Sequence, residues 1–310
     1  MISDGLQEAI ENILACPTCK GRLTLGKGAV SIRCTSCQRT YDIKEGIPVL
    51  FKGEAIIQEE EREYRDHLAG GYAGSDRQSL MEAIGKHHCI PVMRRHAEEF
   101  RNRFKPSEWI LDIGIGWGWH WAEQGEGARI LGMDMSLGNL ILAKRILDED
   151  DANVVLICAD ASALPILENV VSGIWGVQVF QHFPQEVLHQ VQTDLASILR
   201  NEFVMEIYNL NLPLLHKIIY HLFGKQFHCH GKQGEMELNR RSSKEWTDIW
   251  QEFGNGSRKL SHSYSELFFH PDLRFRPHKY PIKLENVIAE YAPKLAALFA
   301  RQVQIRIEAR

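Results

Sequence analysis

The chain has 310 residues, of which 44% are hydrophobic and 25% charged, and its formal net charge is −4. This composition is that of a globular protein long enough for one large domain and one small one. The chain as a whole carries no net positive charge that would attract nucleic acid. No stretch approaches the ~18 apolar residues of a membrane helix, and the N-terminus lacks the basic and apolar regions of a signal peptide. We therefore expect a cytoplasmic protein that makes no membrane contact.

Four of the seven cysteines form two Cys-x-x-Cys pairs. Cys16 and Cys19 are the first pair, Cys34 and Cys37 the second, and fourteen residues separate them. Each pair aims two thiolates at one point, and two pairs supply the four sulfurs that tetrahedral zinc takes. A redox pair is the alternative. We predict a structural Zn²⁺ held by all four cysteines, with a hairpin between the pairs.

Residues 14–51 resemble a known family. Cys-Pro-x-Cys-Lys-Gly-x-Leu is followed by the second cysteine pair and then by Tyr-Asp-Ile-Lys-Glu-Gly-Ile-Pro-Val-Leu at 41–50. This pattern is similar to the small zinc-ribbon proteins that partner methyltransferases or are fused to them. A more distant likeness is the ribbon at the front of a bacterial rRNA guanine methyltransferase. The resemblance implies a zinc ribbon over residues 1–53 that can contact a protein partner.

Residues 54–107 are predicted to be a linker followed by N-terminal helices. The run Glu-Glu-Glu-Arg-Glu at 59–63 is typical of a solvated helix face. Tyr72 follows a Gly-Gly break and is a candidate lid residue, although an ordinary loop tyrosine fits as well. Helical periodicity covers 77–104 and is interrupted at Pro91.

From residue 108 to 310 apolar strands alternate with helices. This alternation is typical of an α/β fold with a doubly wound, mostly parallel, seven-stranded sheet, and we predict an insertion at about 209–245 that caps the pocket. The predicted strands are 108–113, 128–134, 154–160, 170–179, 202–208, 258–268 and 302–309, and the predicted helices are 136–149, 185–200, 242–253 and 293–299.

A glycine-rich turn follows the first strand of this domain. Gly114, Gly116 and Gly118 stand at alternate positions, where the backbone must bend sharply and approach a ligand, and residues 119–124 can begin a helix. The strand before the turn ends in Asp112. The next strand ends in Asp134, a position where an acid typically bonds the ribose hydroxyls of a nucleoside cofactor.

Two cofactor classes fit a glycine turn of this kind. Dinucleotide sites carry G-x-G-x-x-G, whereas the spacing here is G-x-G-x-G. The carboxylate of Asp112 would repel a pyrophosphate but suits a cofactor with an ammonium group. S-adenosylmethionine (SAM) has an amino-acid head, a ribose and no phosphate, so the pattern favours SAM.

Four motifs in chain order then resemble the class I SAM-dependent methyltransferases over residues 72–310. They are Asp-Ile-Gly-Ile-Gly-Trp-Gly at 112–118, the acid at 134, Asp-Ala at 160–161 and Val-Gln-Val-Phe-Gln-His-Phe at 177–183. The resemblance implies a Rossmann-like methyltransferase with SAM as its cofactor. It implies cofactor-binding roles for Asp112, Gly114, Gly116, Asp134, Met135, Asp160, Ala161 and Gln178.

Carried over residue by residue, the resemblance divides SAM among these positions. The two glycines line its methionine part and Asp112 holds the ammonium group, directly or through water. Asp134 bonds the ribose hydroxyls, Asp160 bonds the adenine amino group, and Gln178 lies beside the sulfonium. Trp117 and Trp119 depart from the family, where small residues are usual. They either pack against the cofactor or fill the interface with the preceding helix.

The acceptor is less constrained than the cofactor. The methyl donor is already activated, so a general base is needed only when the acceptor atom carries a proton, and His182 is the candidate base. We expect an oxygen or nitrogen nucleophile of a small-molecule or natural-product acceptor. The alternatives are rRNA or tRNA read by the ribbon, and a non-catalytic SAM-binding or scaffold protein. The RNA alternative is supported by the order of ribbon and transferase in the chain and by the basic residues Lys20, Arg22, Lys27, Arg33 and Arg39.

Overall fold

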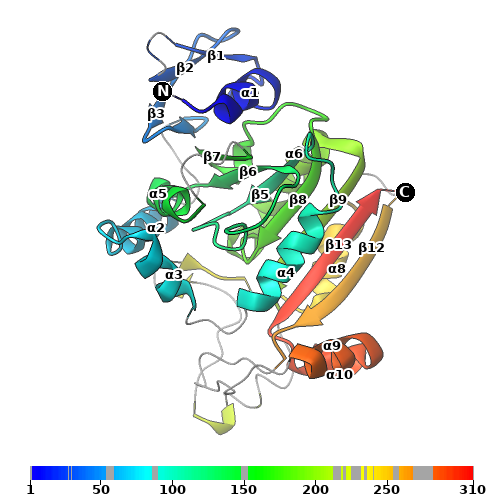
Figure 1. Ribbon diagram of the computed structural model, residues 1–310. Helices are drawn as coiled ribbons and strands as arrows, with labels where there is room; N and C mark the ends of the chain where they lie inside the picture. Colours follow the sequence, from blue (N-terminus) through cyan, green and yellow to red (C-terminus); the bar gives the residue numbers. More distant parts are fainter. Residues whose placement is uncertain are drawn as a thin grey trace.

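The protein is represented by a computed structural model in which one long mixed sheet carries helices on both faces (Figure 1). The residues described are 2–26, 28, 30–53, 59–85, 90–147, 153–211, 218, 221–224, 232–233, 236–239, 241–253, 258–267 and 282–309. About half of the predicted insertion at about 209–245 lies outside these residues, as does Lys27.

Eleven strands form the main sheet, in the order β1-β2-β3-β4-β7-β6-β5-β8-β9-β13-β12. All seven strands predicted after residue 108 are present, as the part running from β7 to β12, in which the five strands from β7 to β9 are parallel and the last two antiparallel. The strands are β1 (Leu23–Leu25), β2 (Ser31–Cys34), β3 (Thr40–Lys44), β4 (Ile47–Leu50), β5 (Trp109–Ile113), β6 (Arg129–Asp134), β7 (Val154–Ala159), β8 (Val171–Val177), β9 (Leu199–Leu210), β12 (Arg258–Ser265) and β13 (Gln302–Ala309). A separate two-stranded sheet pairs β10 (Lys232–Gln233) with β11 (Met236–Glu237).

The expectation of seven strands is wrong because the ribbon joins the sheet. β4 pairs with β3 on one side and runs parallel to β7 on the other, with Val49 opposite Cys158 and Leu50 opposite Ala159. Figure 1 shows the blue N-terminal strands beyond the β7 edge of the core sheet. Unpaired strand edges tend to recruit another strand, and β4 covers this one within the same chain. The ribbon and the α/β domain are therefore one continuous structure.

The helices cover the two faces of the sheet in two separate apolar cores. Side chains of α1, α6 and α8 contribute to one core, and side chains of α3, α4 and α5 to the other. Ser242 caps α8 in a capping box with Glu245, as its place before a helical pattern indicates. The helices are α1 (Asp4–Asn12), α2 (Glu59–Gly70), α3 (Arg77–Gly85), α4 (Ile90–Arg101), α5 (Leu137–Leu147), α6 (Gln185–Ile198), α8 (Ser243–Gln251), α9 (Ile282–Tyr291) and α10 (Pro293–Phe299), with short 3₁₀ turns η2 (Ala161–Ala163) and η3 (Phe180–His182).

The α1 helix and the ribbon pack directly on the α/β domain. The backbone amide of Ala15 donates to the carbonyl of Pro165, and the amide of Leu167 donates to the carbonyl of Ile13. Lys20 donates from Nζ to the carbonyl of Leu164 at 2.5 Å. These contacts fix the ribbon against the segment that follows η2, close to the carboxyl end of β7. In the described part of the chain, no helix combines the length and the hydrophobicity needed to cross a bilayer.

One local prediction differs from the structure: residues 119–123 form turns, residue 124 is irregular, and no helix begins there. The glycines of the preceding loop have positive φ angles, as has Glu123 at 64°. His120 and Trp121 both bond the side chain of Asp112, which pulls the segment under the end of β5. These bonds and the left-handed residues prevent a regular helix from starting after the glycine loop.

Candidate functional site

A cavity of about 610 Å³ opens at the carboxyl ends of the parallel strands. This is where ligands bind in open α/β sheets, because loops there face a crevice between neighbouring strand ends. Eight of the nine residues predicted for the cofactor and the catalytic base line this one cavity: Gly114, Gly116, Asp134, Met135, Asp160, Ala161, Gln178 and His182. The structure thus brings together residues that span 69 positions of the chain, from 114 to 182. The ninth, Asp112, is buried and does not line the cavity.

The glycine loop and Asp134 are joined by direct hydrogen bonds. The Gly116 amide donates to Oδ2 of Asp134 at 2.9 Å, and the Ser136 amide donates to Oδ1 at 2.8 Å. Burial raises the pKa of Asp134, and the two amide bonds and nearby Arg65 oppose that rise. Each carboxylate oxygen keeps a second lone pair, so Asp134 can still accept from a diol such as the two ribose hydroxyls.

Asp160 continues the wall at the end of β7. Its Oδ1 accepts from the Ser162 amide at 2.8 Å and caps the short turn η2, which places Ala161 at the cavity. Cys158, two residues earlier in β7, lies behind this wall and contacts the carbonyl of Met135 through its sulfur at 3.5 Å. Burial raises the pKa of the Cys158 thiol to about 12, so it remains protonated and acts as a buried apolar group.

Gln178 and His182 form the wall after β8. Gln178 adopts a left-handed conformation with φ 56°, and its amide donates to the carbonyl of Tyr208 at 2.7 Å. A non-glycine residue held in this region is strained unless its surroundings fix it, and such positions concentrate at binding sites. The turn η3 then carries His182 to the same cavity.

The α2 helix supplies cavity residues that the sequence did not reveal. Glu61 is 6% exposed and lines the cavity together with Arg65, which donates to Glu61 Oε1 at 3.1 Å. The same Oε1 lies 3.4 Å from Nδ1 of His182, while Oε2 is buried without a hydrogen-bond partner in the described structure. The expectation that the acidic run at 59–63 is wholly solvated is wrong at this position. Residues 61 and 65 are one helical turn apart, so both side chains reach the cavity from the same face of α2.

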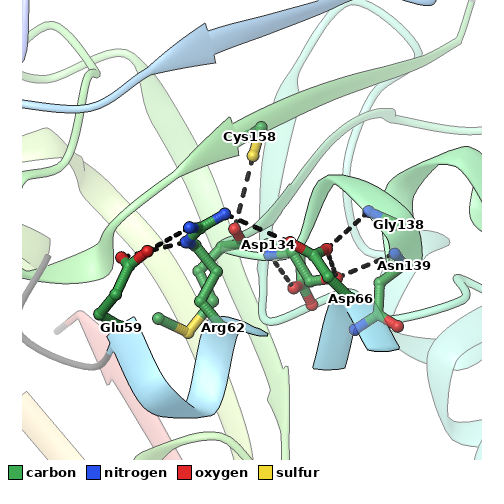
Figure 2. A network of polar contacts seen from close by, with 9 residues as sticks. Glu59, Arg62, Asp66, Asp134, Gly138, Asn139 and Cys158 are labelled. Atoms are coloured by element: carbon green, nitrogen blue, oxygen red, sulfur yellow. Dashed lines mark hydrogen bonds and ion pairs between the residues drawn. The ribbon is translucent and has the colours of Figure 1, made fainter. Parts of the chain in front are cut away.

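A second face of α2 is fixed to the start of α5. Asp66 Oδ1 accepts from Ser136 Oγ at 2.6 Å. It also accepts from the Gly138 amide at 2.9 Å (Figure 2). Arg62 pairs with Asp66 at 3.2 Å and with Glu59. An acid at a helix N-terminus is stabilising because it accepts from unpaired amides. Asp66 therefore holds α2 over the segment that follows Asp134.

Asp112 is 1% exposed and contacts two side chains of the turn after the glycine loop. Its Oδ2 lies 2.7 Å from His120 Nε2 and accepts from Trp121 Nε1 at 2.6 Å. Strand alternation explains the direction of the side chain, since it projects to the same face of the sheet as Trp175 on the neighbouring strand. His120, which the sequence did not single out, is the residue of this group that lines the cavity.

The two unusual tryptophans line the cavity as well. Trp117 donates from Nε1 to Oδ1 of Asn139 at 3.2 Å and packs edge-on against Tyr72, with ring centroids 4.9 Å apart. Both contacts place Trp117 at the Asp134 end of the cavity. Trp119 packs edge-on against His120 at 5.2 Å. Tyr72 is 38% exposed and lies at the cavity, as the lid hypothesis expects.

The four ribbon cysteines converge as predicted. Their sulfurs all lie within 4.8 Å of one another, with Cys16 and Cys37 at 3.7 Å and Cys19 and Cys34 at 3.5 Å. Tetrahedral zinc with four thiolates places sulfurs about 3.8 Å apart, as bonds of ~2.3 Å dictate. The donor set fits Zn²⁺ with every position filled by protein, which makes the site structural. The hairpin between the pairs is confirmed as β1 and β2.

Tyr41 supports this zinc site from outside the four sulfurs. Its hydroxyl lies 3.0 Å from Cys16 Sγ, and a donor to a metal-bound thiolate stabilises the charge on that ligand. We expect Tyr41→Phe to weaken zinc binding about tenfold or more, measured by competition with a colorimetric chelator. Tyr291→Phe, on an exposed side chain far along the chain, is the control. Equal zinc affinity in the two variants would show that the Tyr41 hydroxyl has no role.

The glycine loop can be tested at Gly114, whose φ is 71°. A Cβ there would lie 2.7 Å from Cγ2 of Val179 and 2.9 Å from its Cβ. Left-handed strain and this overlap together predict that Gly114→Ala lowers the free energy of unfolding by about 2 to 4 kcal/mol. Gly74→Ala, where a Cβ meets nothing within 4 Å, should change it by less than about 0.5 kcal/mol. Chemical denaturation measures both, and equal midpoints would contradict the argument.

Two family models match the chain in separate segments. The model described as "Methyltransferase domain" matches residues 110–202, and the model described as "Trm112p-like protein" matches residues 10–46. Curated relatives match the N-terminal segment. The UPF0434 protein of Vibrio atlanticus is 51% identical over 43 residues, which are 14% of this chain and 73% of that protein. The UPF0434 protein of Alteromonas mediterranea is 44% identical over 43 residues, which are 14% of this chain and 67% of that protein.

Solved structures share the fold at low sequence identity. A complex of the Haloferax volcanii Trm112 methyltransferase activator with a methyltransferase matches with a TM-score of 0.50 and 15% identity, covering 82% of this chain and 97% of that chain. Phosphoethanolamine N-methyltransferase 2 of Haemonchus contortus, bound to SAM, matches with a TM-score of 0.50 and 15% identity. The match covers 85% of this chain and 61% of that chain. At these identities the likeness is one of fold.

Proposed function

Since the chain belongs to the UPF0434 (Trm112-like) family in its N-terminal segment and is a SAM-dependent methyltransferase in its α/β part, we propose that it methylates a small molecule. The acceptor atom in this proposal is an oxygen or nitrogen that carries a proton. Residues 1–53 act as the ribbon, 54–107 as the linker and cover, and 108–310 as the transferase. The proposal includes a reducing, cytoplasmic compartment, since the four thiolates must stay reduced to hold zinc.

The observation that carries the proposal is the buried pair of Glu61 and His182 in the cavity wall. Glu61 Oε1 lies 3.4 Å from Nδ1 of His182, and both residues face the cavity that also contains Gln178. A histidine oriented by a carboxylate is a common arrangement for taking a proton from a nucleophile. A pair of this kind in the cavity wall is suited to take a proton that the acceptor loses during transfer.

The cofactor end of the cavity is proposed to bind SAM through the residues already described. Asp134 would hold the ribose, Asp160 and Ala161 the adenine, and the glycine loop the methionine part. When bound, SAM supplies a methyl group already activated for transfer. Gln178 follows the cofactor residues in the sequence and precedes His182. In this proposal it lies beside the methyl group that is transferred. The remaining task of the protein is to position the acceptor and remove its proton.

In this mechanism His182 accepts the proton of the acceptor O–H or N–H at Nε2, since Nδ1 is the nitrogen next to Glu61. Glu61 fixes the ring and stabilises the imidazolium that forms. Arg65 holds Glu61 through Oε1 and keeps the carboxylate in place. The α2 helix therefore supplies a positioning residue, and η3 supplies the base.

The acceptor would occupy the end of the cavity that lies beyond the cofactor residues. We assign to that end four further residues that line the cavity: Phe183, Glu266, Arg301 and Gln302. Arg301 and Glu266 form an ion pair at 2.5 Å, so the lining offers both charges beside an aromatic ring. Cavities of this size, partly apolar with a few polar groups, are typical small-molecule sites.

The RNA alternative loses support from its basic residues. Lys20 donates to the carbonyl of Leu164, Arg22 to the carbonyl of Glu11 and Arg39 to the carbonyl of Lys52. Each of these three side chains uses a donor on a contact within the protein, which reduces but does not remove its capacity to bind an RNA phosphate. Trp117 or Trp119 over the sulfonium would support the non-catalytic alternative, and Trp117 instead contacts Asn139 and Tyr72.

Two measurements test the proposal in sequence. Calorimetry with S-adenosylhomocysteine (SAH) should show one site per chain, and Asp134→Asn should weaken it strongly. Transfer of a tritiated methyl group should then label a metabolite pool but neither total RNA nor a protein extract. Label in RNA would favour the RNA alternative, and SAH binding without any label would favour the non-catalytic one. Absence of SAH binding would overturn the proposal as a whole.

A further inference from the structure

Asp112 lies too deep to touch a molecule in the cavity. It is 1% exposed, and Oδ2 already contacts His120 and Trp121. Its Oδ1 is buried and has no hydrogen-bond partner within the described residues. A buried carboxylate without a full set of partners is costly unless a positive group stands beside it. The residue in place to carry that positive charge is His120.

His120 is placed between this carboxylate and the cavity. The residue is 4% exposed and belongs to the cavity wall, and its Nε2 is the nitrogen that meets Asp112 at 2.7 Å. No hydrogen bond of Nδ1 occurs in the described part of the chain, and Nδ1 is not among the fully buried atoms that lack a partner. The rings of Trp119, Trp121 and Trp175 surround the imidazole at centroid distances of 5.2, 5.1 and 6.1 Å. The imidazole is thus fixed by packing, with one nitrogen left for a ligand.

The loop geometry creates a need for a positive group at this place. Anions commonly bind at helix N-termini, where unpaired amides and the helix dipole attract them. Here the residues after the glycine loop form turns, so the loop is followed by no helix N-terminus. Arg65 also lines the cavity, but it is paired with Glu61. Next to the glycine loop, His120 is the side chain placed to meet an anion.

We propose that His120, held as an imidazolium by Asp112, binds the α-carboxylate of the methionine part of the cofactor. This inference rests on the proposed function, in that SAM occupies the cavity. Asp112 is then a positioning residue that acts through His120 and makes no contact with the cofactor. The role differs from the one that the family resemblance implies for Asp112, a contact with the ammonium group.

Two ligands that differ only in the carboxylate test this inference by calorimetry. The first is SAH, and the second is 5′-(3-aminopropylthio)-5′-deoxyadenosine, which keeps the ammonium group and lacks the carboxylate. A charge-assisted hydrogen bond predicts that the unmodified protein binds SAH about 10- to 100-fold more tightly than the amine. His120→Gln keeps a donor for Asp112 but loses the charge. His120→Gln should bind SAH about 10- to 100-fold more weakly than the unmodified protein does. Its affinity for the amine should stay within about threefold of that of the unmodified protein.

The matched control is His189→Gln, on an exposed histidine of α6, which should bind both ligands as the unmodified protein does. Equal losses for the two ligands in His120→Gln, or no loss for either, would overturn the inference. If the unmodified protein binds both ligands equally well, the inference fails while the proposed function stands. If it binds neither, the proposed function fails and the inference with it.

A second measurement avoids any substitution at this buried position. Nitrogen-15 NMR of the histidine-labelled, full-length protein reports the protonation of each ring nitrogen. In the SAH complex we expect the signal of one histidine with both ring nitrogens protonated, and this signal should be absent from the spectrum of His120→Gln. The Nδ1 chemical shift of this histidine should differ between the SAH complex and the amine complex. A neutral His120 in the SAH complex, or identical shifts with the two ligands, would overturn the inference even if the variant proves unstable.

Discussion

His182→Ala is expected to lower kcat by about 10²- to 10⁴-fold, the range of general-base catalysis, while the affinity for SAH stays near that of the unmodified protein. The reason is that His182 meets Glu61 at the cavity wall, whereas the ribose and adenine residues lie on other loops. The rate is measured with the acceptor found by the tritiated-methyl assay. Added imidazole should restore part of the lost rate in this variant, as it does when a base is missing.

The control for this variant is His189→Ala, on the exposed face of α6, which should leave kcat unchanged. Glu61→Gln tests the positioning role. It should lower kcat by less than His182→Ala and leave the KM for SAM nearly unchanged, with Glu63→Gln on the exposed side of the same helix as its match. A full rate in His182→Ala would show that the acceptor needs no base and would remove the main support for the proposed acceptor class.

Removal of zinc is expected to abolish SAH binding as well as the fold of the ribbon. Structural zinc contributes about 10 to 16 kcal/mol of apparent binding free energy, as much as the total stability of a typical domain. Loss of the metal from the four cysteines should therefore unfold the segment that ends in β4. Since β4 pairs with β7 next to Cys158 and Ala159, the strand that leads to Asp160 then becomes an open edge.

The α2 helix transmits the same loss to the other side of the cofactor site. It follows the ribbon along the chain and holds the start of α5 through Asp66, beside Asp134 (Figure 2). Cys34→Ser should reproduce the effect of chelation, and Ser36→Ala, in the same knuckle but outside the ligand set, should not. Zinc content, SAH calorimetry and hydrogen exchange at β7 are the readouts. Unchanged SAH affinity in zinc-free protein would show that the ribbon is independent of the site.

The cofactor site was predictable because its signals are local. A strand that ends in an acid needs only a few residues of sequence to be recognised, and parallel strands bring their carboxyl ends to one edge of the sheet. Asp134 and Asp160 therefore line the same cavity as the glycine loop. The zinc site was predictable for the same reason. Each Cys-x-x-Cys pair spans four residues, and the hairpin between the pairs brings the four sulfurs together.

The tertiary structure alone decided what lies above and below that site. Glu61 belongs to an acidic run whose sequence predicts a solvated helix face. The packing of α2 on the strand ends instead buries Glu61 beside His182. Asp112 lies one residue before the end of β5, but the turn after the glycine loop brings His120 between it and the cavity. The pairing of β4 with β7 also depends on an edge contributed by residues about a hundred positions away. Such contacts follow from long-range packing, which the periodicity and spacing of short segments do not encode.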